Sequence, residues 1–512
     1  MKHALLLLAL CLSLISSAQQ RLDDLPMHWQ VSEAVQANFI ETDTFRHTAF
    51  RPYTRGLLVL DSLQTYFTKD MRYFTPAGLK TFGDHLITVK QDDFELFIDP
   101  ILDLELGFDL SDSTAYADTV QLYNNTRGLR LAGSIGQKVS FQTALFENQS
   151  FLPLYLKNYA DSLGVIPGQG RWKLFETVGY DYSASTGKFA VQISDRFDAS
   201  IGHGKMFIGN GYRSMLLSDF AFNAAYLRAD YHSLDKKWLF SKVHFEMNGL
   251  NRLPLGEVPE SLLEKKALGV HYLSFAPNKK IELGLYEAVV WQRFDSADGS
   301  QALPWNAFTP VPLLNAAVLG LDDDRHNVLL GVNAHIKWNK GIQSYAQFIV
   351  DDLKNEAYGL QAGLRFRNIL KGLHAQIEYN KASEGVYGHQ IGLQNYSHNN
   401  DPLAHPLGND FEEVLVIVHH EWKRWWSRYQ LNYQHLNRSN SAPSAVDGIP
   451  LNTLQERWIG EVQLGYTMNP KLRWQWLMGF RYRSGHESSG VNETSYLYFG
   501  MRTAIVNKYN DF

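Results

Sequence analysis

This sequence has few cysteines, no long hydrophobic run past its first residues and no excess of basic charge. Its 512 residues include one cysteine, Cys11, near the N-terminus, so the rest of the chain has no disulfide or thiol chemistry. No later apolar run approaches the length of a transmembrane helix, which excludes a helical membrane protein. The formal net charge of -5 gives no basic excess, so nucleic acid is not an expected partner.

The first residues are typical of a secretory signal peptide. Lys2 and His3 precede an apolar run over residues 4–15, and small residues at 16–18 suit a cleavage site. The run is too short to span a bilayer as a helix, and the bulky Leu10 before Cys11 is unlike a lipoprotein site. We therefore predict a signal peptide over residues 1–18.

The C-terminal hundred residues alternate between apolar and polar side chains. Between residues 472 and 482, one face carries Trp474, Trp476, Met478 and Phe480, and the other is mostly polar or small. A period of two with one wide apolar face is typical of strands that have lipid on one side and water on the other. The pattern predicts an all-β transmembrane barrel that contacts outer-membrane lipid.

The same alternation predicts about eighteen antiparallel strands. They lie near residues 101–108, 127–135, 137–146, 175–184, 188–196, 222–231, 237–247, 267–275, 280–290, 327–338, 342–351, 357–367, 372–381, 412–420, 427–437, 456–467, 471–483 and 493–505. Short turns follow the even-numbered strands, one of them at residues 185–187, and longer loops follow most odd-numbered strands. This asymmetry predicts an outer-membrane protein with its N-terminus in the periplasm and its long loops outside the cell.

Residues 19–93 lack the alternation and are predicted to be short helices and loops. We expect them to form a small N-terminal periplasmic segment at the inner mouth of a barrel that covers residues 94–512. No cofactor, metal site or catalytic set is predicted, because no group of histidines, carboxylates or serines has a diagnostic spacing. The protein is therefore not expected to be an enzyme.

The densest local signal is the glycine-rich segment 201–219. Its context among alternating strands does not fit a dinucleotide or phosphate loop, which needs a strand before and a helix after the glycines. Two interpretations stay open: a loop folded into the lumen that fixes the shape of the barrel, or a segment in direct contact with a ligand. The candidate ligand-binding residues of this segment are His203, Lys205, Asn210, Tyr212 and Arg213.

Residues 207–219 resemble a glycine-containing segment of Wzi-type capsule assembly proteins, and are still closer to RemB-like gliding-motility proteins of Bacteroidetes. Residues 401–412 resemble a second RemB-like stretch, and residues 155–170 a third. The sequence departs from the Wzi pattern at Ile208 and Asn210, where tryptophan and proline are usual. The resemblance implies an eighteen-stranded barrel with a helical periplasmic segment. It also implies surface polysaccharide as a partner, in capsule attachment or in gliding motility and adhesion, with the motility machinery as a further partner.

The lumen itself offers residue types that bind carbohydrates. Alternation points many amides, carboxylates and guanidinium groups inward, although any wide barrel lines its interior with polar side chains. The additional candidate residues are Arg365, Gln376, Glu378, His405 and Arg481. Two functions therefore compete: a surface protein that binds or organises polysaccharide, and a diffusion porin for small solutes.

Overall fold

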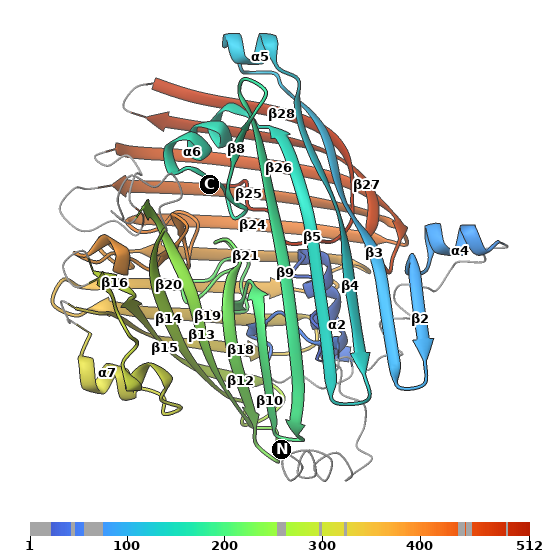
Figure 1. Cartoon of the computed structure of the whole chain (residues 1–512). Coiled ribbons are helices and arrows are strands. Elements are labelled where there is room, and N and C mark those ends of the chain that lie inside the picture. The colour runs from blue at the N-terminus through green and yellow to red at the C-terminus, as the bar shows by residue number, and fades with distance from the viewer. Residues whose placement is uncertain are drawn as a thin grey trace.

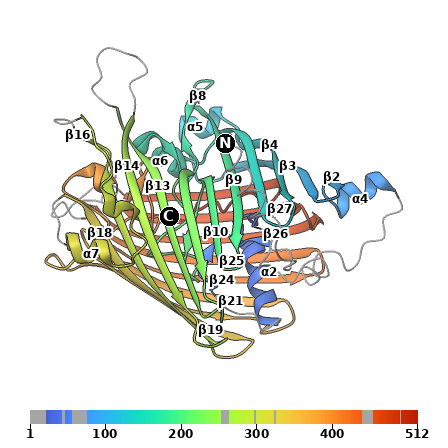
Figure 2. The same cartoon turned by 60° about the horizontal axis from the view of Figure 1, so that its bottom comes forward.

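The computed structural model describes residues 22–41, 47–55, 75–252, 263–295, 299–321, 325–438, 446, 453–487 and 490–512. The predicted signal peptide lies outside these residues. Within them the chain forms a closed antiparallel barrel of eighteen strands, and the turned view in Figure 2 shows the ring that they enclose (Figure 1). The all-β fold and the predicted strand number are confirmed.

The barrel strands follow one another around the ring in chain order, and the last strand pairs with the first. They are β3 (Phe94–Asp109), β4 (Leu122–Ile135), β5 (Val139–Phe151), β9 (Gly179–Ser194), β10 (Phe197–Gly204), β12 (Ala224–His232), β13 (Trp238–Arg252), β14 (Leu263–Phe275), β15 (Ile281–Gln292), β18 (Asn327–Lys337), β19 (Ile342–Asp352), β20 (Ala357–Phe366), β21 (Leu373–Ala382), β24 (Phe411–Trp422), β25 (Trp425–Arg438), β26 (Thr453–Asn469), β27 (Trp474–Glu487) and β28 (Gly490–Arg502). The short strands β2 (Ile87–Gln91) and β8 (Lys173–Phe175) pair with β3 and β9.

The predicted turn at residues 185–187 is wrong. Strand β9 runs straight through it, because Thr186 pairs with Ala144 of β5 and Gly187 pairs with both Thr143 of β5 and His203 of β10. The turn lies instead between β9 and β10, and β10 was not predicted. Pairing on both edges outweighs the local turn preference of Ser, Thr and Gly. The predicted count stayed at eighteen because one strand was split and one was missed.

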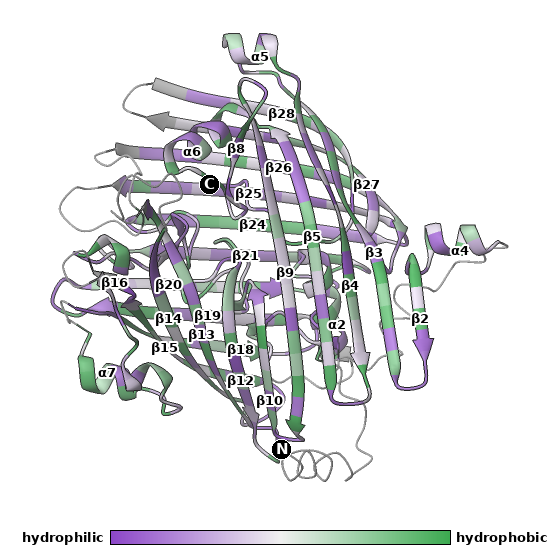
Figure 3. Cartoon of the chain, viewed as in Figure 1, coloured by the Kyte–Doolittle hydropathy of each residue, from purple (hydrophilic) through white to green (hydrophobic). Residues whose placement is uncertain are grey.

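Apolar and polar residues are interspersed along the barrel strands, as the coloured ribbon shows (Figure 3). On β27, Trp476, Met478 and Phe480 are exposed, whereas Gln475 and Arg481 are buried toward the lumen. The predicted lipid-facing side of this strand is therefore confirmed. In the described part of the chain, no helix is both long and apolar enough to cross a membrane.

The lumen is filled by segments from four parts of the chain. The first is the N-terminal stretch with helix α2 (Trp29–Glu41), seen within the ring in Figure 1, and β1 (Phe50–Arg51). Strand β1 pairs with β11 (Phe207–Ile208) of the second segment, which joins β10 to β12. The loop between β21 and β24 and the tail after β28 complete the filling.

Residues 19–93, predicted as one periplasmic segment, are divided in the structure. Residues 22–41 and 47–55 contact inward-facing side chains of the wall: Glu33 of α2, for example, pairs with Arg367 just after β20 at 2.7 Å. Helix α4 (Pro76–Phe82) lies beside the turn between β26 and β27, where Asn469 donates to the carbonyl oxygen of Lys80 at 3.0 Å. The functional boundary at residue 93 stays a prediction.

Candidate functional site

The glycine-rich segment is held inside the barrel by a buried ion-pair cluster. The Arg213 guanidinium lies 3.1 Å from Glu413 Oε1 of β24 and 3.0 Å from Asp511 Oδ2 of the tail. Burial acts to lower the pKa of Arg213, but the two carboxylates outweigh it and raise that pKa well above its ordinary value. Arg213 is thus a permanent cation that joins the loop, the wall and the tail.

Glu378 of β21 binds the backbone of the same segment. Its Oε2 accepts the N–H of Tyr212 at 2.8 Å, and its Oε1 accepts the N–H of Arg213 at 3.1 Å. The hydroxyl of Tyr345 donates to Oε2 at 2.7 Å, and Gln376 donates its amide to the Tyr345 hydroxyl at 2.7 Å. Glu378 and Gln376 therefore serve the internal packing of the lumen, and their hydrogen bonds are directed to the protein.

Arg365 and Asn210 also make hydrogen bonds that serve the internal packing of the lumen. Arg365 Nη2 donates to the Asn210 carbonyl oxygen at 2.8 Å, and its Nε donates to Gln376 Oε1 at 3.3 Å. Asn210, fully buried, donates to the Thr48 hydroxyl at 2.8 Å and accepts from Asn333 of β18 at 3.1 Å. These contacts join the N-terminal stretch to the glycine-rich segment.

His405 and Lys205 connect two lumen-filling loops to their surroundings. His405 Nε2 lies 2.8 Å from Glu413 Oε2, and both side chains are fully buried. Lys205 Nζ donates to the carbonyl oxygens of Gly168 and Asp219 at 2.7 and 3.0 Å. Burial lowers the pKa of Lys205 to about 8, against the opposing effect of nearby carboxylates. Both residues have roles in holding loops together.

His203 is the least enclosed of these candidates. It lies on β10, is half-buried, and its Nδ1 is 2.9 Å from the Ser185 carbonyl oxygen. It lines a smaller cavity with Lys205 and Asn223. Seven of the ten sequence candidates are thus joined in one buried network, directly or through Glu413, and three lie outside it. The seven are Asn210, Tyr212, Arg213, Arg365, Gln376, Glu378 and His405. The three are His203, Lys205 and Arg481.

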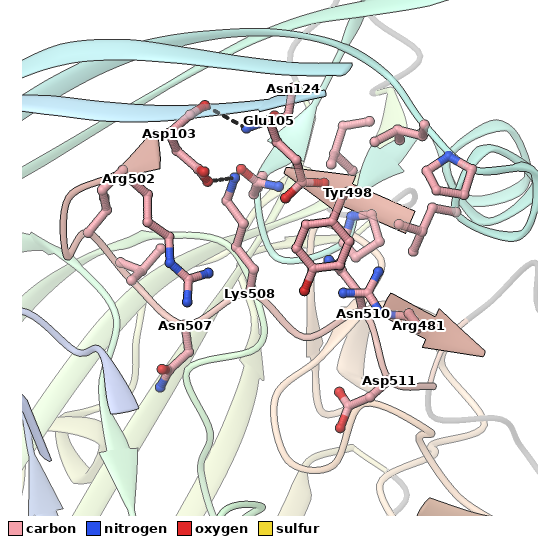
Figure 4. Close-up of a pocket in the computed structure, with 18 of the residues that line it drawn as sticks. Asp103, Glu105, Asn124, Arg481, Tyr498, Arg502, Asn507, Lys508, Asn510 and Asp511 are labelled. Carbon is pink, nitrogen blue, oxygen red and sulfur yellow. Dashed lines mark hydrogen bonds and ion pairs between the residues drawn. The ribbon is translucent and has the colours of Figure 1, made fainter. Parts of the chain in front are cut away.

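A cavity with a volume of about 110 Å³ lies between the inner wall and the tail (Figure 4). Of the sequence candidates it brings together Tyr212 and Arg481. Its remaining chemistry comes from side chains outside the candidate set, among them Trp29, Asp103, Glu105, Glu461, Tyr498, Arg502 and Lys508. Alternation places Arg502 on the inner face, but no pattern in the sequence indicates Trp29 or Lys508, which lie outside the barrel strands.

Most charges along this cavity are already paired. Lys508 Nζ lies 2.5 Å from Asp103 Oδ2, and Arg481 Nη2 lies 2.5 Å from Glu461 Oε1. Arg502 differs: its guanidinium points into the cavity, and within the described residues its buried Nε and Nη2 have no hydrogen-bond partner (Figure 4). Arg502 therefore has two donors left for another group, and Arg481 has one, its buried Nε, within the described residues.

Aromatic rings form the other part of the lining. The ring centroids of Tyr212 and Trp29 both lie 5.4 Å from the Arg428 guanidinium carbon. Tyr498, whose hydroxyl donates to Glu461 at 2.9 Å, lies close to Tyr496, with 5.4 Å between ring centroids. The cavity thus combines flat ring faces with charged and amide groups.

Comparison with known proteins finds likeness in structure alone. No family model and no curated protein matches the sequence. The fold is similar to that of Wzi of Escherichia coli, an outer-membrane protein involved in group 1 capsule assembly and a carbohydrate-binding β-barrel. The TM-score is 0.59 at 13% identity, and the match covers 95% of this chain and 100% of Wzi.

The chain also matches two Pseudomonas aeruginosa outer-membrane proteins, more distantly. OccK1 (OpdK) gives a TM-score of 0.45 at 12% identity, covering 80% of this chain and 98% of that protein. OprD gives 0.44 at 10% identity, covering 84% and 98%. The likeness to Wzi shows that the chain has a Wzi-like barrel fold.

Proposed function

We propose that this chain is a non-enzymatic outer-membrane protein that binds or organises surface polysaccharide, in capsule attachment or in gliding motility and adhesion. The observation that carries the proposal is the cavity along the inner wall, where tyrosine and tryptophan rings alternate with paired charges. The description of Wzi as a carbohydrate-binding barrel supports the same class of ligand. The link to gliding is supported by the sequence resemblance of residues 207–219 and 401–412.

The lining fits a sugar in chemical terms. Aromatic side chains such as Tyr498 and Trp29 offer apolar faces with a polar handle, which suits a ring that has apolar and hydroxyl-bearing sides. The free donors of Arg502 suit a hydroxyl or an anionic oxygen of the same ligand. Tyr212 and Arg481, which line this cavity, are the sequence candidates that we retain as ligand contacts.

The filled lumen supports this proposal over a diffusion porin. Barrels of sixteen to eighteen strands that act as porins leave an aqueous channel. Here the cavity along the inner wall has a volume of about 110 Å³, which is room for several water molecules, and segments from four parts of the chain lie inside the ring. Passive diffusion of solutes is therefore the weaker candidate.

Binding of the producer's surface glycan to purified protein in nanodiscs tests the proposal. Tyr498→Phe and Arg502→Gln should each weaken binding about tenfold, since the loss of one hydrogen-bonding group costs on the order of 1–3 kcal/mol. The matched control is Lys381→Gln, which changes a cation on the half-exposed edge of β21. If all three variants bind the glycan with equal affinity, the cavity is not the binding site. If the unmodified protein does not bind the glycan, the proposed function is wrong.

A further inference from the structure

One stretch of the barrel's outer face is polar at a level where its neighbours are apolar. The register aligns one outward residue from each of six consecutive strands into a row. From β12 to β19 the row reads Ala229, Lys242, His271, Glu287, Leu330 and Val350. Three titratable side chains thus interrupt the lipid-facing belt, where charged groups are costly.

The pair in the middle of this row is covered from outside by the loop that follows β15. His271 Nδ1 lies 2.5 Å from Glu287 Oε2, and its Nε2 lies 2.8 Å from the Thr309 carbonyl oxygen. Glu287 also accepts the N–H groups of Leu313 and Ala316 at 3.1 and 2.8 Å. Residues 299–321, which we name the flap, therefore complete the hydrogen bonds of a histidine–glutamate pair that would otherwise face lipid.

The flap packs on the barrel through apolar side chains as well. Its Ala307 joins Val289 and Trp291 of β15 and Val328 of β18 in a buried cluster. The flap contains η2 (Trp305–Phe308) and helix α7 (Leu314–Leu319), and both views of the molecule show α7 outside the ring of strands (Figures 1 and 2). This loop is thus docked on the wall and not extended into solvent.

The composition of the flap is unusual for a surface loop. None of its residues is Asp, Glu, Lys, Arg or His, whereas charged residues stand on both sides of it, at 298 and at 322–325. Its outer side presents large apolar side chains, with Trp305 74%, Phe308 58% and Val318 60% exposed. Exposure of such an apolar face to water is unfavourable. The face continues the apolar belt of the neighbouring strands.

The backbone of the flap is also suited to lipid, where each unpaired N–H group is costly. Pro304, Pro310 and Pro312 have no N–H group. Other N–H groups donate within the flap or to Glu287: those of Ala307, Thr309, Val311, Leu313, Leu314, Ala316, Ala317 and Gly320. Irregular structure can therefore lie at membrane depth here, because it is held against protein.

From these observations we propose that the flap is a membrane-embedded element, which seals the polar row on β13–β15 and whose outer face is occupied by lipid acyl chains of the outer leaflet. The occupant follows from continuity with the lipid-facing belt and from the absence of charge between residues 299 and 321. The inference does not depend on what the lumen binds.

Spin labels on single cysteines test the proposal in reconstituted bilayers. In a chain carrying Cys11→Ser, labels are placed at Phe308→Cys and Val318→Cys on the flap. Met478→Cys on β27 serves as the lipid-facing reference, and Ser113→Cys in the exposed loop after β3 serves as the aqueous reference. We expect collisions of the flap labels with oxygen to match those at residue 478 and to exceed those at residue 113 several-fold, with few collisions with a water-soluble nickel chelate.

Two outcomes would overturn the proposal. Flap labels that collide with the nickel chelate as often as the label at residue 113 would show a solvated loop. Flap labels shielded from both reagents, with measurable label-to-label distances between copies, would show a protein interface in place of lipid. Since all four positions are exposed, the electrophoretic shift of the folded barrel on heating serves as a check that each variant is folded.

Discussion

Arg213 is the buried cation on which a loop, a barrel strand and the tail converge. It is 1% exposed and lies between Glu413 and Asp511. Arg213→Met should loosen the filling of the lumen, because removing one partner of a buried ion pair costs roughly 3–5 kcal/mol. Amide exchange of residues 205–219 is the measurement, and it should become much faster while exchange in the barrel strands changes little.

Arg213→Lys provides the control for this prediction. It keeps the charge but cannot make the forked contact with two carboxylates, so its effect should be intermediate. Unchanged exchange in Arg213→Met would mean that the segment is held by its apolar contacts and not by the ion-pair cluster.

We expect the contact of Asp401 with the loop that contains Tyr159 and Gly168 to depend on pH. Burial raises its pKa to about 7, although the Tyr159 hydroxyl at 2.8 Å and the Gly168 N–H at 3.1 Å both favour the charged form. Because this pKa lies above the ordinary value of 3.8, stabilisation is complete below pH 4 and is lost as the pH rises through 7. The protection of the Gly168 amide, corrected for intrinsic exchange, should therefore fall from pH 4 to pH 7.

Asp401→Asn should make that protection nearly independent of pH over the same range. Lys205, the nearby cation, titrates near pH 8, so it stays charged over most of the range. A fall of equal size in both proteins would assign the pH dependence to another group.

At the level of single residues, the sequence predicted orientation better than role. Alternation correctly placed Arg365, Gln376, Glu378 and Arg481 on the inner face, where all four are buried. It carried no information on partners far away in the chain, such as the backbone of residues 210–213 that Arg365 and Glu378 bind. Arg481 differs, because its partner Glu461 lies directly opposite on the neighbouring strand β26. The sequence predicts His405 as a ligand-binding candidate, and its contact with Glu413 inside the barrel could not be predicted from the pattern.

Strand β27 is the element whose two faces differ most clearly. Met478 is 51% exposed on the lipid side. Met478→Arg should reduce the free energy of folding into bilayers by roughly 2–4 kcal/mol, the cost of a basic side chain near the midplane. Urea titrations in lipid vesicles measure this change. Ser113→Arg, in the exposed loop after β3, is the control and should have a small effect; equal losses would contradict the assignment of faces.

Strands β9 and β10 show where alternation in the sequence is not sufficient to predict the ends of a strand. The alternation of β24–β28 was read correctly because each strand has a wide apolar face. In β9 and β10, small residues and glycines weaken that contrast, and a local turn signal at 185–187 was taken for a chain reversal. Only the pairing of β9 with both of its neighbours decides that the strand continues.

For the whole molecule, the filled lumen predicts low conductance in planar bilayers. Deleting residues 503–512 removes the contacts of Lys508 with Asp103 and of Asp511 with Arg213. The shortened chain should therefore conduct more than the full chain, since an unfilled barrel of this strand number leaves an aqueous path. The control is Lys157→Ala, which changes a cation in the loop after β5 without touching the tail. Large, steady conductance of the full chain would favour the porin.

The position of the tail also bears on the order in which the molecule is made. The ring closes when β28 pairs with β3, and the residues after β28 lie inside it against segments that precede most of the strands. The tail is the last part of the chain to be synthesised, so its contacts with Asp219 can form only after every barrel strand has been made. Completion of the lumen is therefore a late step in the folding of this chain.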